Sequence, residues 1–75
     1  MPERDSTLVR LGLNIRKRRE ALDFSQEKLA ELSDLDQTYI SGIETGKRNP
    51  GIKNVARLAK ALKTTTSELC KGVEV

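Results

Sequence analysis

Three neutral hydrogen-bonding residues, Gln37, Thr38 and Ser41, are spaced to share one face of a helix. Their short donor and acceptor groups are of the kind that can bond to the edges of base pairs in the major groove of DNA. No lysine or glutamate lies between Asp36 and Glu44, although a helix face that meets only solvent usually carries both. Taken alone, these residues fit an ordinary solvated face better than a face that reads bases. The choice between the two depends on the elements around them.

The chain offers little material for catalysis or metal binding. It contains no histidine and a single cysteine, Cys70, so a zinc site or a Cys–His pair within one chain is not expected. Its carboxylates fall on what look like surface faces of helices, and the domain is too small for a substrate pocket. We therefore expect a protein that is not an enzyme, with no metal, no cofactor and no small-molecule ligand. Cys70 is expected to be a packed thiol.

Length and composition predict one all-α domain spanning residues 1–75. With 36% hydrophobic and 3% aromatic residues, its core must consist of Leu, Ile, Val and Ala. The net charge of +3 permits a polyanionic partner without requiring one. The polar N-terminus, the lone cysteine and the lack of a long apolar run predict a cytoplasmic protein with no signal peptide and no membrane contact.

Helical periodicity predicts a compact five-helix domain. Ser6 or Thr7 is expected to cap the first helix, whose apolar stripe should consist of Leu8, Leu11, Ile15 and Leu22. In the fourth helix, Val55, Leu58, Ala59 and Leu62 should face inward. The helices are expected from about Thr7 to Leu22, from Gln26 to Leu32, from Gln37 to about Thr45, from about Ile52 to Leu62 and from Thr66 to about Lys71.

Local signals mark the ends of the later helices. Ser25 and Asp36 are good N-caps for the second and third helices. Gly46 is placed to end the third helix in the left-handed conformation. Thr65, followed three residues later by Glu68, is a capping box that should open the last helix.

The second and third helices, at about residues 25–45, have the spacing of a helix-turn-helix. Two short helices joined by a turn of three or four residues pack at a steep angle, and Ala30 is small enough for the close crossing. Ile40 and Ile43 supply apolar anchors on the inner face of the second of these helices. This packing would leave Gln37, Thr38 and Ser41 pointing outward.

Residues 12–70 resemble the Cro/C1-type helix-turn-helix family. The matching motifs are Ser25-Gln26, Leu29-Ala30, Ile40-Ser41, Ile43-Glu44 and Arg48-Asn49-Pro50. Within the family, the run from Thr38 to Glu44 and the following Arg48-Asn49-Pro50 are similar to the controller proteins of restriction–modification systems. With the motif in place, base contact becomes the favoured interpretation of the polar face.

The resemblance implies a role for individual residues. The residues expected to read bases are Gln37, Thr38, Tyr39 and Ser41, although Tyr39 could instead pack on its own helix. The residues expected to touch the DNA backbone are Gln26, Lys47, Arg48 and Asn49. Arg19 and Glu44 match an internal ion pair. The chain departs from the family at Asp34, at Gly51 and at Gln37, where controllers often have a basic residue.

These features predict a transcription regulator that binds double-stranded DNA as a homodimer on a palindromic operator. A domain this small gains stability from association, and the C-terminal segment of about residues 65–75 ends in apolar residues. Val75 is one of these apolar residues, and Cys70 and Val73 are the candidates for the interface. The alternative is an antitoxin-like protein whose main partner is a protein and which regulates itself through DNA.

Overall fold

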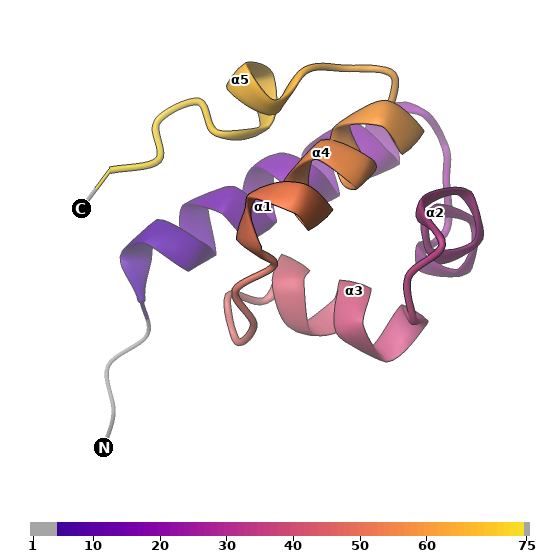
Figure 1. The fold of residues 1–75 in the computed structure, drawn as a ribbon, viewed down its shortest axis with the longest axis horizontal. Coiled ribbons are helices and arrows are strands. Elements are labelled where there is room, and N and C mark those ends of the chain that lie inside the picture. The colour runs from indigo at the N-terminus through magenta and orange to yellow at the C-terminus, as the bar shows by residue number, and fades with distance from the viewer. Residues whose placement is uncertain (1–4, 75) are drawn as a thin grey trace.

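A computed structural model describes residues 5–74, and they form five helices with no strand (Figure 1). The predicted all-α, five-helix architecture is therefore confirmed. Val75, one of the apolar residues of the C-terminal segment, lies outside the described residues. The helices are α1 (Ser6–Ala21), α2 (Gln26–Ser33), α3 (Gln37–Glu44), α4 (Gly51–Ala61) and α5 (Thr66–Leu69).

The start of α1 differs from the prediction. Asp5, and not Ser6 or Thr7, is the N-cap, and its Oδ1 accepts hydrogen bonds from the backbone N–H groups of Thr7 at 2.9 Å and Leu8 at 3.3 Å. A carboxylate at this position satisfies free N–H groups and also interacts favourably with the helix dipole. The helix consequently begins one residue earlier than expected.

The caps of α2 and α3 are those that the sequence predicts. The Ser25 hydroxyl accepts from the N–H of Lys28 at 3.0 Å, and Asp36 Oδ1 accepts from the N–H of Thr38 at 2.7 Å. Between the helices, Asp34 takes the left-handed conformation with φ 58° and ψ 41°. Aspartate tolerates this conformation better than most residues, so it can replace the usual turn glycine.

The last two helices depart from the expected limits. α4 starts at Gly51, whose φ is +73°, and has no side-chain cap. α5 ends at Leu69 instead of continuing to Lys71, and Gly72 follows with φ +76°. The Thr65 hydroxyl accepts from the N–H of Glu68 at 3.1 Å, which supplies one half of the predicted capping box.

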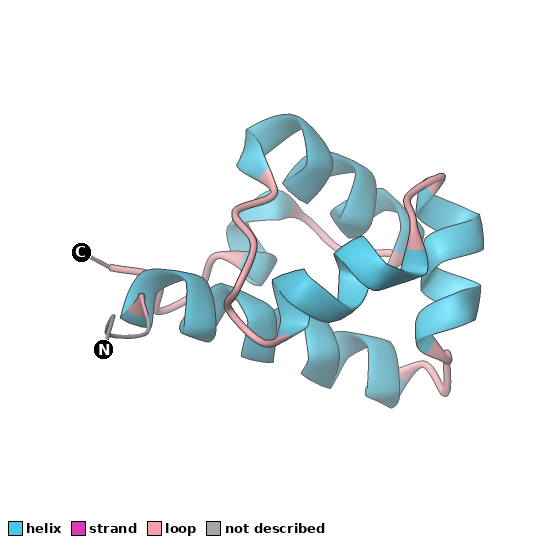
Figure 2. Ribbon diagram, turned by 90° about the horizontal axis from the view of Figure 1, so that it is seen from below, coloured by secondary structure: helices cyan, strands magenta, loops and turns pink. Residues whose placement is uncertain are grey.

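All five helices contribute to one apolar core. α1 packs against α3 and α5, and α2 packs against α3 and α4 (Figures 1 and 2). Of the apolar stripe predicted for α1, Leu11 and Ile15 are buried, whereas Leu8 and Leu22 are only partly buried. Gly12 and Arg19 of this helix are buried as well. The four inward residues predicted for α4 are all buried. The side chains with essentially no exposure are Ile15, Leu29, Ile40, Ile43, Leu58, Leu62 and Leu69.

Two polar side chains of α1 hold the C-terminal segment. Asn14 Nδ2 donates to the carbonyl oxygens of Leu69 and Lys71, each at 2.8 Å, and the Thr7 hydroxyl donates to the carbonyl oxygen of Glu74 at 2.6 Å. The segment after α5 therefore follows α1 back toward its start. None of the described helices is long and apolar enough to cross a membrane.

Candidate nucleic-acid interface

The outer face of α3 presents the three neutral side chains singled out in the sequence. Ile40 and Ile43 are 0% and 1% exposed and fix the opposite face in the core. Gln37 and Thr38 are exposed and Ser41 is half-buried, and within residues 5–74 none of the three side chains has a hydrogen-bond partner. Their donors and acceptors are therefore available to a ligand.

Tyr39 belongs partly to the protein interior. Its ring packs against the core, its hydroxyl donates to the carbonyl oxygen of Pro50 at 3.4 Å, and the hydroxyl accepts from Asn54 Nδ2 at 3.3 Å. These contacts tie α3 to the start of α4. They favour the packing role that the sequence left open for this tyrosine, because the hydroxyl is already engaged within the chain.

The loop after α3 is attached to the end of that helix. The N–H groups of Lys47 and Arg48 donate to the carbonyl oxygen of Gly42 at 2.9 and 3.1 Å. A Cβ on Gly42 would lie 2.6 Å from Cγ of Arg48, so the glycine leaves room for the arginine stem to cross α3. The guanidinium then lies 6.0 Å from the centre of the Tyr39 ring, within cation–π range.

The loop also presents exposed donors beside the polar face of α3. Lys47, Arg48 and Asn49 are all exposed. Asn49 Oδ1 accepts from the N–H of Gly51 at 3.0 Å, which leaves its Nδ2 group as the free donor. Two cations and an amide therefore lie next to a neutral hydrogen-bonding helix face, an arrangement suited to a phosphate backbone beside base edges.

Arg19 and Glu44 form the expected ion pair, and it is buried. Arg19 Nε lies 2.7 Å from Glu44 Oε2, and Nη2 donates to Oε1 at 3.0 Å. Nη1 donates to the carbonyl oxygen of Phe24 at 2.8 Å. The hydrogen bond to Glu44 raises the pKa of Arg19 above its ordinary value, so the guanidinium stays charged. The pair joins α1 to the end of α3.

Gln26 extends this network. Its Nε2 donates to Glu44 Oε1 at 3.0 Å, and the residue is half-buried. The sequence predicts a phosphate contact for Gln26. The bond to Glu44 uses one of the two N–H donors of the amide, and the other stays available to a phosphate oxygen, so this contact stays a prediction. The side chain also connects α2 to the ion pair between α1 and α3.

Two glycines, Gly12 and Gly42, have packing roles that were not predicted from the sequence. A Cβ on Gly12 would lie 2.4 Å from the carbonyl oxygen of Ile43 and 2.5 Å from that of Glu44, so the backbones of α1 and α3 touch at this residue. The available signal is a glycine inside a strong helical pattern, which costs about 1 kcal/mol relative to alanine and so implies a packing reason. Gly42 has a different packing role, because its lack of a side chain leaves room for the stem of Arg48.

Comparisons with known proteins agree with this geometry. The family model described as "Helix-turn-helix" matches residues 15–69. The chain is 43% identical over 67 residues to control protein C.MunI of a Mycoplasma species, covering 88% of this chain and 90% of that protein. The crystal structure of the restriction–modification controller protein C.AhdI from Aeromonas hydrophila has a TM-score of 0.85 and 43% identity, covering 87% of this chain and 98% of that one. A tetramer of the controller protein C.Esp1396I, solved in complex with its natural 35 base-pair operator, has a TM-score of 0.82 and 35% identity, covering 92% and 91% of the two chains.

Proposed function

The chain belongs to the Cro/C1-type helix-turn-helix family of DNA-binding transcription regulators, and from this premise we propose that it binds a palindromic operator as a homodimer and controls restriction–modification genes in the cytoplasm. The observation that carries the proposal is the free polar face of α3 beside the exposed loop at residues 47–49. The named relatives are controllers, and C.Esp1396I has been solved on its operator.

In this proposal α3 enters the major groove and its outer face reads the bases. Gln37 lies in the first turn, exposed and without an internal partner, and glutamine pairs in bidentate fashion with adenine N6 and N7. Thr38 and Ser41 contact neighbouring bases, while Lys47, Arg48 and Asn49 hold the phosphate backbone. The buried ion pair keeps α3 at a fixed angle to the rest of the domain, and so sets the register of these contacts.

The homodimer follows from the amount of DNA that one helix can read. α3 has eight residues and can contact only a few base pairs. Two copies related by a two-fold axis, about 34 Å apart, would read both halves of a palindrome. Cys70 and Val73 are half-buried and pack against the core from the segment held by Asn14 and Thr7. A fixed, partly apolar surface of this kind is suited to an isologous contact.

Val73→Asp tests the dimer and, with it, the proposed function. A carboxylate placed in an apolar interface loses hydration, so sedimentation at micromolar concentration should show a monomer and the palindrome should bind more weakly. Leu32→Asp is the matched control for association, because Leu32 is a 46% exposed apolar side chain on α2. A monomeric wild type that binds a half-site as tightly as the palindrome would refute the dimer.

DNA binding should depend strongly on salt. Each phosphate that Lys47, Arg48 or another cation neutralises releases counterions, so log K should fall with log salt at a slope of about −0.9 per neutralised phosphate. Fluorescence anisotropy with a labelled operator fragment over a salt series measures this slope. A flat response would contradict phosphate contact, as would a failure to bind genomic fragments at low salt.

Gln37→Ala and Lys47→Ala should have different effects on binding. Gln37→Ala should lose roughly 1–3 kcal/mol on the operator and relax the preference at one position in each half-site. Lys47→Ala should weaken operator and unrelated DNA by the same factor, because a phosphate contact carries no sequence information. Binding to a set of singly substituted operators separates the two. Equal weakening on every sequence by Gln37→Ala would show that it reads no base.

A further inference from the structure

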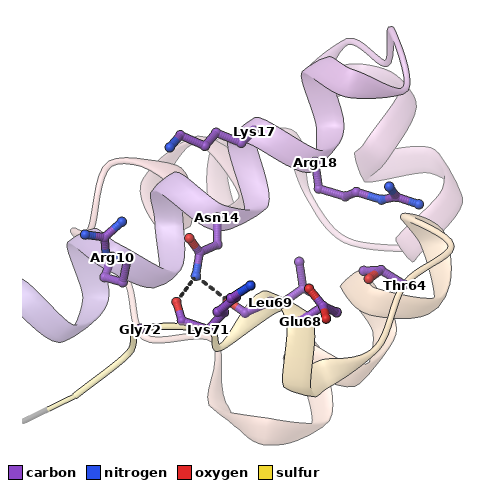
Figure 3. A pocket seen from close by; sticks show the side chains of 9 residues that line it. All are labelled: Arg10, Asn14, Lys17, Arg18, Thr64, Glu68, Leu69, Lys71 and Gly72. Atoms are coloured by element: carbon purple, nitrogen blue, oxygen red, sulfur yellow. Dashed lines mark hydrogen bonds between the residues drawn. The ribbon is translucent and has the colours of Figure 1, made fainter.

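A cleft of about 610 Å³ opens between α1 and the C-terminal segment, and basic side chains line both of its walls (Figure 3). Arg10, Lys17 and Arg18 extend from α1, and Lys71 stands on the opposite wall. Glu68 is the one carboxylate among the lining residues. The cleft is thus a concentration of positive charge outside the DNA-reading face of α3, and its Lys71 lies between Cys70 and Val73 of the proposed dimer contact.

None of the four cations of the cleft forms an ion pair within residues 5–74. The ion pairs of residues 5–74 are Arg16–Glu20 and Arg19–Glu44, and neither includes a residue of the cleft. Four cations and one carboxylate leave three positive charges in the cleft, which equals the formal net charge of +3 for the whole chain. The cleft therefore carries a local excess of positive charge.

The walls of the cleft are held in place before any ligand arrives. Asn14 bonds to the carbonyl oxygens of Leu69 and Lys71, as the dashed lines in Figure 3 show. Arg18 donates from Nε to the carbonyl oxygen of Leu62 at 2.9 Å and from Nη2 to that of Lys63 at 3.0 Å. Prior ordering of this kind lowers the entropy cost of binding.

The position of the cleft separates it from the DNA-reading face. In Figure 1, α3 lies at the lower edge of the molecule and α5 at the upper edge, with α1 and α4 between them. A duplex held against α3 would therefore leave the cleft open. The cleft could then be filled by a second partner while the operator is bound.

We propose that this cleft binds an acidic segment of a partner protein, through aspartate or glutamate carboxylates. The distance from Arg10 to Arg18 along α1 is roughly 12 Å at 1.5 Å per residue, which about four residues of an extended peptide would cover. Several carboxylates of one chain fit this length better than a single small anion does. No aromatic side chain lines the cleft to stack on a base, so a nucleotide is disfavoured.

The test measures the binding of a labelled octapeptide of alternating glutamate and serine by fluorescence anisotropy. Lys17→Glu/Lys71→Glu should weaken binding by at least about tenfold, because two attractive contacts become repulsive. Arg57→Glu/Lys60→Glu is the control, since it makes the same charge change on exposed residues of α4 and should leave the affinity within about twofold. Circular dichroism verifies that both variants fold.

Each other outcome would overturn the proposal. If both double variants weaken peptide binding equally, the peptide is held by general charge attraction and not by the cleft. Displacement of the peptide by tripolyphosphate or by an unrelated duplex at lower concentration would assign the cleft to phosphate ligands. Loss of dimers in the Lys17→Glu/Lys71→Glu variant would assign it to a second copy of this chain. Only the simultaneous binding of peptide and operator rests on the proposed function. If the chain fails to bind the operator but still binds the peptide, the proposed function fails while the proposal for the cleft does not.

Discussion

Glu44→Ala is expected to lower the free energy of unfolding by about 3–5 kcal/mol, because it leaves a buried guanidinium without its carboxylate. The Arg19 side chain is 11% exposed and the Glu44 side chain 2% exposed, so the guanidinium would lose its carboxylate in a largely desolvated site. Arg19 stays charged and would keep only the carbonyl oxygen of Phe24 as an acceptor. Gln26 would lose its acceptor in the same change.

Urea unfolding followed by circular dichroism measures this loss. Glu20→Ala is the matched control, because it removes the other ion pair of the described chain, in which both side chains are more than half exposed. An exposed pair of this kind contributes no more than about 0.5 kcal/mol. If the Glu44→Ala and Glu20→Ala variants have the same midpoint, the buried pair does not stabilise the fold.

The helix-turn-helix was predictable because its signals are local. Ser25 and Asp36 cap the helices that follow them, and Gly46 takes the left-handed conformation expected of it. Each of these features depends on residues within one turn of helix. The alternation of inward Ile40 with outward Ser41 then determined which side chains of α3 face solvent.

Features that depend on residues far along the chain were harder to predict from the sequence. Nothing near Gln26 in the sequence shows that Glu44 lies within hydrogen-bond distance of its amide. The Tyr39 hydroxyl is satisfied by Pro50 and Asn54, which approach only when α4 packs. The prediction of the cap of α1 was wrong for another reason. The sequence offers several capping residues next to one another, and the carboxylate of Asp5 is the one that caps the helix.

Gly12→Ala is expected to destabilise the fold by about 3 kcal/mol, at the upper end of what overpacking usually costs. The added methyl group would stand 2.4 and 2.5 Å from two backbone carbonyl oxygens of α3. Backbone atoms inside a helix cannot move aside alone, so α1 and α3 would have to separate. That separation would also strain the ion pair between Arg19 and Glu44, which bridges the same two helices.

Gly42→Ala is the matched control for this change, since both glycines lie inside helices without a positive φ. Its methyl group would meet only the stem of Arg48, an exposed and flexible side chain. Arg48 can move, and alanine improves helix propensity, so the unfolding free energy should change by no more than about 1 kcal/mol. Equal midpoints for the Gly12→Ala and Gly42→Ala variants in urea would show that α1 and α3 can separate freely, and close backbone contact at Gly12 would then not hold α3 in place.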